Sequence, residues 1–162
     1  MELKKTGFYF HWVCLNKLAI GPAPRKQDHF NILFESGIQS IFTLCDEKDT
    51  LIPESQKLRF SCKRITLPDH RSNRDPLVNE LIEAINLLRV LTNKSIVYVH
   101  CLAAIERSPL ICIAWLVLEQ QLSFQEALEY MKEVHPETNP LPSYFHVMNK
   151  AVKYIKLNNP IC

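Results

Sequence analysis

A cysteine and an arginine, separated by five residues, lie between an apolar run and a longer apolar segment; residues 96–109 read IVYVHCLAAIERSP. The β-branched residues before Cys101 predict a strand, and the apolar residues after Pro109 predict a helix. A loop that leads into a helix N-terminus offers an anion backbone N–H groups and a favourable dipole. Arg107 adds a planar cation suited to phosphate, and positive surroundings favour the thiolate form of a cysteine. The arrangement indicates a cysteine nucleophile beneath a bound phosphate.

The flanking residues make this signal specific, more than the Cys-x5-Arg spacing does. Six cysteines and seven arginines in 162 residues produce such a spacing by chance about one time in four. Requiring His100 before the cysteine and Ser108 after the arginine lowers that chance to below about one in a thousand. The competing interpretation is an ordinary cysteine at a strand end and a solvated arginine at a helix start.

Composition sets bounds on the fold and on the partners. We expect one domain over residues 1–162 and a monomer. A formal net charge of +2 is too small to indicate nucleic-acid binding, and no apolar run reaches the roughly 20 residues of a membrane span. The apolar N-terminal segment contains His11 and lacks a small-residue cleavage site, so we expect a cytoplasmic protein. Cysteines without a Cys-x2-Cys pair predict free thiols, with no metal and no cofactor.

Alternating strand-like and helix-like patterns predict an α/β fold with a single central, mixed and mostly parallel sheet flanked by helices. The expected strands are 8–13, 17–20, 38–45, 61–67 and 96–100. The expected helices are 27–36, 53–59, 76–92, 109–120, 124–133 and 143–157. Gly37 closes the first helix, Asp75 and Pro76 open the third as N-cap and first residue, and Ser123 begins a capping box. The Cys-x5-Arg loop would then follow the carboxyl end of a strand, where ligands of such sheets bind.

A thiolate that displaces an oxygen leaving group from phosphorus benefits from a proton donor. The turn-rich segment 68–76 offers two carboxylates for this role. Asp75 is better explained as a helix cap, whereas Asp69 has no comparable structural role, so Asp69 is the favoured acid. In the same segment, Arg71 and Arg74 are either a basic rim for an anionic substrate or solvated loop side chains, and His70 carries little weight as a second acid.

The signature His100-Cys101-x5-Arg107-Ser108 resembles that of the protein tyrosine phosphatase superfamily. Asp69 lies about thirty residues upstream of the cysteine, which resembles the small atypical dual-specificity branch. The resemblance covers roughly the first 120 residues and includes the segments 10–13, 18–21 and 37–45.

The resemblance implies a role for each matching residue. Cys101 would attack phosphorus and form a phosphocysteine, while Arg107 and the loop residues bind the phosphate oxygens. Asp69 would protonate the leaving group and then activate water, and Ser108 would assist departure of the thiolate. His100 would support the loop from behind. The phosphate-binding loop residues are Leu102, Ala103, Ala104, Ile105, Glu106 and Arg107.

Three loop or strand residues need structural information. The family usually has glycine where this chain has Ala104, so a positive φ there would cost on the order of 1 kcal/mol. Glu106 would pair with Arg107, pair with another basic residue, or repel a dianion. In some relatives a cysteine at the position of Cys45 forms a disulfide with the nucleophile, so the resemblance implies a redox partner for Cys101; the alternative is a buried strand cysteine.

The leading function is that of a cysteine-dependent protein tyrosine or dual-specificity phosphatase, acting on a phosphorylated protein or a small phosphorylated molecule. An alternative is a weak or inactive pseudophosphatase that binds phosphorylated ligands, which Ala104 leaves open. Rhodanese-like sulfur chemistry or arsenate chemistry is a third interpretation. It is less favoured because those enzymes do not require an acid such as Asp69.

Overall fold

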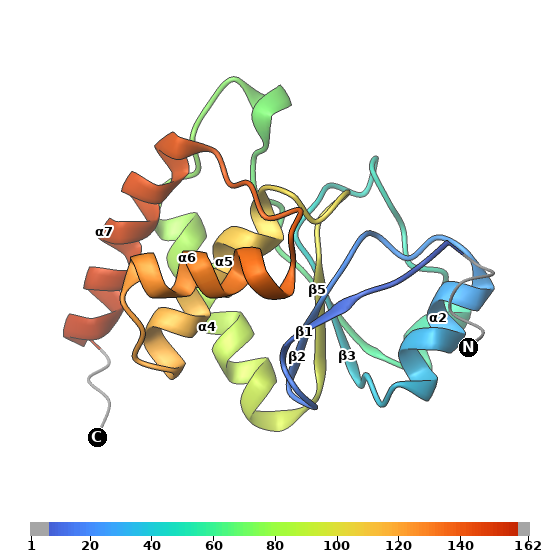
Figure 1. The fold of residues 1–162 in the computed structure, drawn as a ribbon. Coiled ribbons are helices and arrows are strands. Elements are labelled where there is room, and N and C mark those ends of the chain that lie inside the picture. Colours follow the sequence, from blue (N-terminus) through green and yellow to red (C-terminus); the bar gives the residue numbers. More distant parts are fainter. Residues whose placement is uncertain (1–6, 159–162) are drawn as a thin grey trace.

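The computed structural model describes residues 7–158 and is built around one five-stranded sheet (Figure 1). The strands are β1 (His11–Cys14), β2 (Leu18–Ile20), β3 (Ser40–Thr43), β4 (Ser61–Arg64) and β5 (Val97–His100). They lie in the order β1-β2-β5-β3-β4, in which β1 pairs antiparallel with β2 and all other pairs are parallel. The predicted fold class, a mixed and mostly parallel sheet, is confirmed.

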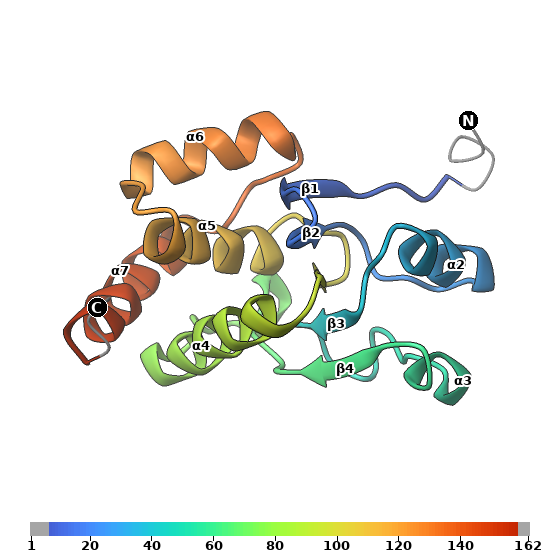
Figure 2. The same ribbon diagram turned by 90° about the horizontal axis from the view of Figure 1, so that it is seen from below.

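Helices cover both faces of this sheet, as the view in Figure 2 shows. The helical elements are α2 (Gln27–Glu35), α3 (Glu54–Lys57), η1 (His70–Ser72), α4 (Val78–Lys94), α5 (Arg107–Glu119), α6 (Phe124–Val134) and α7 (Pro142–Asn158). Helices α4 to α7 lie on one side of the sheet, and α2 and α3 lie on the other. No helix within residues 7–158 is both long and apolar enough to cross a bilayer.

Strand alternation divides the buried residues between two cores. Successive side chains of a strand point to opposite faces, so Val97 and Val99 of β5 pack on the α4–α7 side and Tyr98 packs on the α2 side. On that second side Tyr98 belongs to one buried cluster with Phe30 and Leu33 of α2. Central β5 is therefore buried on both faces, and its carboxyl end is held firmly in place.

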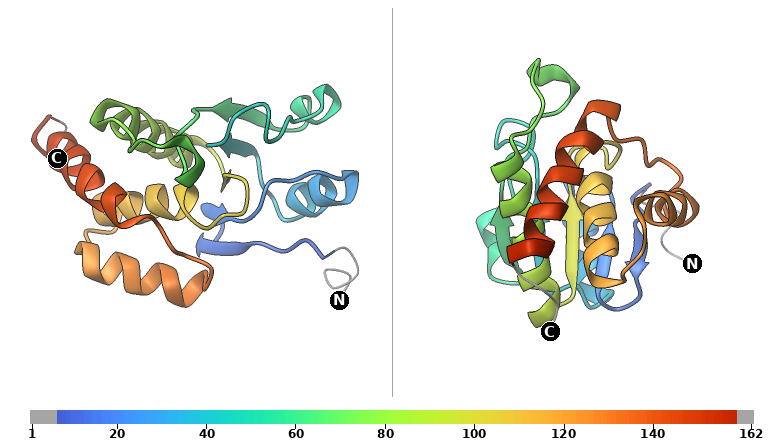
Figure 3. Two further views of the ribbon diagram at one scale, coloured as in Figure 1. Left: turned by 90° about the horizontal axis from the view of Figure 1, so that it is seen from above. Right: turned by 90° about the vertical axis from the view of Figure 1, so that its left-hand side faces the viewer.

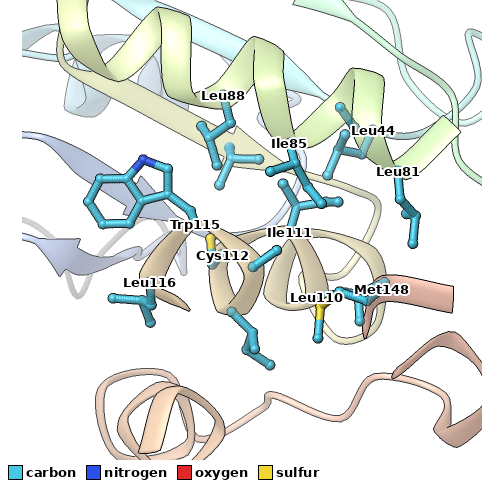
Figure 4. Packing of buried hydrophobic residues seen from close by; sticks show 14 of the residues in the cluster. Leu44, Leu81, Ile85, Leu88, Leu110, Ile111, Cys112, Trp115, Leu116 and Met148 are labelled. Atoms are coloured by element: carbon cyan, nitrogen blue, oxygen red, sulfur yellow. The ribbon is translucent and has the colours of Figure 1, made fainter. Parts of the chain in front are cut away.

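Helix α5 is buried on nearly every side, which is typical of a helix that is apolar all round. It lies against α4, α6 and α7 (Figure 3). Ile85 and Leu88 of α4 lie over Ile111 of α5 in the close view of Figure 4. The indole Nε1 of Trp115 donates to Thr92 Oγ1 at 3.1 Å, so the one polar group of that large side chain is also satisfied. This packing fixes the start of α5, where the arginine of the signature lies.

Two helix starts differ by two residues from the sequence prediction. Helix α4 begins at Val78, and its cap is Leu77, whose backbone N–H donates to the Glu80 carboxylate at 2.8 Å. The Asp75 carboxylate instead accepts a hydrogen bond from Ser143 Oγ at 2.7 Å, so its predicted capping role is wrong. Helix α5 begins at Arg107 itself, two residues before the predicted start.

Candidate active site

The Cys-x5-Arg loop connects the end of β5 to the start of α5, at the edge of the sheet where the parallel strands end (Figure 1). The segments 65–77 and 135–141 pass beside it on the same edge (Figure 3). A hollow of about 310 Å³ opens there. It is lined by Asp69, His70, Arg71, Cys101, Leu102, Ala103, Ile105, Glu106 and Arg107. The structure thus brings the segment 68–76, which carries the predicted acid Asp69, and the predicted phosphate loop to one cavity.

Cys101 and His100 lie at the base of the loop. Cys101 is 3% exposed, and its Sγ lies 3.3 Å from Ser108 Oγ, the hydroxyl expected to assist it. His100 Nδ1 donates to the Cys101 carbonyl at 2.7 Å, so its Nε2 accepts from Thr43 Oγ1 at 2.8 Å. Burial lowers the pKa of His100 to about 4, which keeps the ring neutral. The His100 ring therefore ties the cysteine backbone to β3.

Arg107 is nearly enclosed, with 4% of its surface exposed. Its Nη1 donates to the Leu67 carbonyl at 3.2 Å, and its Nη2 lies 3.3 Å from Asp69 Oδ2. Its Nε is buried and has no hydrogen-bond partner among the described residues. A buried donor left unpaired costs about 1–3 kcal/mol, so this guanidinium is suited to an anionic ligand that would accept from it.

Asp69 is 6% exposed and is held by the cations around it. Its Oδ1 accepts from the Arg71 backbone N–H and its Oδ2 from Arg71 Nε, both at 2.9 Å. Burial raises the pKa of Asp69, but the bonds from Arg71 and the charge of Arg107 outweigh it, and the net pKa is lowered. Arg71 in turn binds the Asp49 carboxylate at 2.8 Å. Sequence reasoning missed this Asp69–Arg71–Asp49 chain, because nothing in the spacing of Asp49 points to the loop.

Ala104 has a φ of 59°, so the condition under which a Cβ is strained at this position is met. A Cβ in this left-handed conformation costs roughly 1–2 kcal/mol. The Ala104 carbonyl accepts from His135 Nε2 at 2.7 Å, and the next carbonyl, that of Ile105, accepts from the Asn139 N–H at 2.9 Å. The His135 ring therefore holds the strained residue from outside the loop.

Three loop carbonyls are bonded to the surrounding scaffold, since the Leu102 carbonyl also accepts from the Ala23 N–H at 3.1 Å. In a trans peptide the N–H points opposite to the C=O of the same unit. The N–H groups that follow these carbonyls, those of Ala103, Ile105 and Glu106, therefore point away from the scaffold. A row of amides aimed in this way is what an anion requires.

Glu106 pairs with His70, the residue after Asp69. Its carboxylate accepts from the His70 N–H at 3.2 Å and contacts His70 Nδ1 at 2.8 Å. Of the three alternatives for Glu106, the structure therefore supports pairing with a basic residue other than Arg107. Arg74 binds Glu80 at 2.9 Å, so it does not form a free basic rim.

Cys45 is buried at the end of the strand next to β5 and is a free thiol, like the other cysteines among residues 7–158. Burial raises its pKa, and the neighbouring Cys101 thiol adds to the rise, whereas Arg107 lowers it. Cys45 and Cys101 are not bonded to each other in this structure. Arg64 donates to the Cys45 carbonyl and anchors this position to β4.

Comparison with known proteins agrees with this geometry. A family model described as dual specificity phosphatase, catalytic domain, matches residues 23–153. The chain belongs to this family. A curated relative, the phosphatidylglycerophosphate phosphatase PTPMT2 of Arabidopsis thaliana, is 23% identical over 146 residues, which cover 89% of this chain and 62% of the relative. The human dual specificity protein phosphatase 5 is 36% identical over 75 residues, which cover 46% of this chain and 18% of the relative.

This dual-specificity phosphatase family chain thus spans less than two thirds of the length of those curated relatives. Solved structures share its fold. The crystal structure of PTPMT1 in complex with PI(5)P matches with a TM-score of 0.78 and 19% identity, covering 92% of this chain and 97% of that one. The human tyrosine phosphatase-like serine/threonine/tyrosine-interacting protein matches with a TM-score of 0.76 and 19% identity, covering 91% and 97%.

Proposed function

We propose that this chain hydrolyses phosphomonoesters through a phosphocysteine intermediate on Cys101. The observation that carries the proposal is the buried guanidinium of Arg107, whose Nε has no hydrogen-bond partner among the described residues. This guanidinium lies beside Asp69, and both residues line the same hollow as Cys101. Membership of the dual specificity phosphatase family supports the same chemistry.

In the first step, the Cys101 thiolate attacks phosphorus, an S–P bond forms, and the bond to the leaving oxygen breaks. The loop amides and the Arg107 guanidinium bind the phosphate oxygens and supply fixed positive charge where negative charge is transferred. In the second step, water attacks phosphorus, the S–P bond breaks, and the thiolate returns to its contact with Ser108 Oγ. The scheme needs no metal.

Asp69 acts as the proton donor for the leaving oxygen in the first step and as the base for water in the second. Its pKa is lowered in the structure, so it carries no proton while Arg71 and Arg107 surround it. A phosphate dianion bound next to Asp69 disfavours the carboxylate and draws Arg107 to its own oxygens. Substrate binding therefore raises the protonated fraction of Asp69 where the proton is needed.

The test is hydrolysis of p-nitrophenyl phosphate combined with trapping of the intermediate. Mass spectrometry of the protein, denatured in acid during turnover, should find phosphate on the peptide that contains Cys101. Cys101→Ser should abolish turnover, and Asp69→Ala should lower kcat for an alkyl phosphate by about 10²–10⁴. A Cys101→Ser protein with an undiminished rate would refute the proposal.

The second candidate is a phospho-ligand binding module without turnover, and one observation favours it. Asp69 is paired with both Arg71 and Arg107, so a chain that keeps these pairs when ligand binds would hold phosphate but lack an acid. In that case a phosphotyrosine peptide would bind wild-type and Cys101→Ser protein equally, and neither would release phosphate. Measurable turnover that Asp69→Ala lowers decides for the enzyme.

The rim of the hollow favours a substrate with a single phosphate on an apolar or aromatic group. Leu102, Ala103 and Ile105 contribute apolar surface, while the nearby cations Arg71 and Arg74 are already neutralised by Asp49, Asp69 and Glu80. Little free positive charge remains for a second phosphate. We therefore propose phosphotyrosine-like esters as the substrate class, ahead of phosphoserine, phosphatidylglycerophosphate and PI(5)P. A comparison of kcat/KM across these four substrates tests the order.

A further inference from the structure

Two histidines from opposite ends of the chain meet outside the catalytic hollow. His11 is the first residue of β1, and His135 follows the last residue of α6. Their Nδ1 atoms lie 2.8 Å apart, although 124 residues separate them in sequence. Neither residue lines the hollow around Cys101.

The second nitrogen of His135 fixes which of its atoms is free to act as a ligand. Its Nε2 contacts the Ala104 carbonyl at 2.7 Å, and a carbonyl only accepts, so Nε2 carries the hydrogen. The Nδ1 lone pair is therefore presented toward His11. A histidine whose other ring N–H donates to a backbone carbonyl is the usual arrangement of a metal-ligating imidazole.

A carboxylate completes the cluster. Glu137 Oε2 lies 3.6 Å from His135 Nδ1, and ligand atoms of His11, His135 and Glu137 all lie within 4.8 Å of one another. Two tetrahedral ligands at about 2.0–2.1 Å from zinc are separated by roughly 3.3–3.4 Å, so the distances of 2.8 and 3.6 Å bracket the required spacing.

Two hydrogen bonds hold the turn that carries Glu137 in place. Thr138 Oγ1 donates to the His135 carbonyl at 2.7 Å, which fixes the turn that carries Glu137. The Asn139 N–H donates to the Ile105 carbonyl, which joins the same turn to the phosphate loop.

The proton between the two histidines must leave before a cation can bind both Nδ1 atoms. His11 donates its Nδ1 proton to His135, and half-buried His11 can transfer that proton to its own Nε2 through water when Nδ1 becomes a ligand.

We propose that His11, His135 and Glu137 form a binding site for a divalent transition-metal cation of the zinc class, outside the catalytic hollow. Two imidazoles and one carboxylate are a donor set that zinc accepts, with water in the remaining position. The cation would bind Nδ1 of His135, polarise its Nε2–H and strengthen the bond to the Ala104 carbonyl. The metal site and the strained residue of the phosphate loop would thus share one imidazole ring.

Zinc added to the full chain tests this site, with Cys101→Ser as the background because that substitution removes the reactive thiol as a competing ligand. Calorimetry should show one bound Zn²⁺ per chain. Nitrogen-15 spectra of histidine-labelled protein should show the Nδ1 signals of His11 and His135 moving to metal-bound positions, while the Nε2–H of His135 stays protonated. This readout requires no substitution in the cluster.

Matched variants locate the ligands. Glu137→Gln removes an exposed carboxylate, and His135→Gln keeps an amide donor at the position of Nε2 while deleting Nδ1. Both Glu137→Gln and His135→Gln remove a direct ligand. Each should therefore weaken zinc binding by more than the roughly 10–100-fold caused by loss of a residue that only hydrogen-bonds to a ligand. His146→Gln, on α7, should bind zinc like the parent.

Three results would overturn the proposal. Zinc binding that shifts the His70 signals instead would assign the cation to Asp69, His70 and Glu106 at the catalytic hollow, whose ligand atoms also lie within 4.8 Å of one another. Zinc binding that survives both Glu137→Gln and His135→Gln would place the cation elsewhere. No binding at millimolar zinc would leave His11 and His135 as a hydrogen-bonded pair.

Discussion

The bond from His135 to the Ala104 carbonyl should be worth more to the phosphate loop than to the rest of the fold. Ala104 holds a φ of 59°, which costs roughly 1–2 kcal/mol, and its carbonyl is bonded by a buried imidazole. His135→Leu keeps a side chain of similar size but leaves a buried acceptor unpaired. A loss of that kind costs about 1–3 kcal/mol, enough to let the strained residue relax.

The expected result is a decrease in kcat/KM for p-nitrophenyl phosphate of about 5- to 150-fold, since about 1.4 kcal/mol corresponds to one factor of ten. His135→Gln is the matched control, because its amide can still donate to the Ala104 carbonyl, and it should retain most of the activity. Urea denaturation of both variants separates an effect on the loop from an effect on the free energy of unfolding.

A double-mutant cycle identifies the strain as the cause. Ala104→Gly allows the same φ without the cost of a Cβ, so His135→Leu should lower kcat/KM less in that background than in the wild type. The coupling energy between the two sites should be at least about 0.5 kcal/mol. Equal losses in both backgrounds, or a fully active and stable His135→Leu protein, would refute the reasoning.

Other side chains of the site lead to three more predictions. Burial lowers the pKa of His100 to about 4, so the unfolded chain binds a proton below about pH 6.5 that the folded chain does not. His100 should therefore reduce the free energy of unfolding by up to about 3 kcal/mol as the pH falls from about 6.5 to about 4, and an equally steep fall in His100→Gln under urea denaturation would contradict this. Arg71 lowers the pKa of Asp69, so in Arg71→Leu the decline of kcat with rising pH on an alkyl phosphate should begin at higher pH; an unchanged profile would contradict this. We also propose that mild peroxide converts the Cys101 thiolate to a sulfenic acid, which the Cys45 thiol condenses to a disulfide with release of water; peptide mapping that finds sulfinic Cys101 beside free Cys45 would argue against it.

Short-range patterns were enough to predict the loop and the elements on either side of it. The loop and the helix start after it contain Cys101, Arg107 and Ser108. Because so few residues separate the three, their spacing in sequence keeps them close in space. The capping box at Ser123 likewise predicts the start of α6, because its partner lies three residues away. The expected cytoplasmic location and monomeric state remain predictions.

Contacts between distant segments were beyond sequence reasoning. The local sequence predicts Asp75 as a helix cap, but its carboxylate binds Ser143, 68 residues further along the chain. Arg71 looked like an optional rim cation, but it holds the carboxylates of Asp49 and Asp69 together. Propensity and spacing describe what a residue can do locally, and they do not reveal which competing partner the fold will bring closer.

Ala104 and Glu106 of the loop are each bonded to a histidine from another segment. Ala104, where the family usually has glycine, is bonded through its carbonyl to His135, and Glu106 is bonded to His70. These partners lie outside the loop, so its conformation depends on long-range contacts as well as on its own sequence. A loop with glycine at position 104 would depend less on His135, and the turn that carries His135 also carries the proposed metal ligand Glu137. A cation bound at the proposed site would therefore act on the strained residue of the loop through the His135 ring.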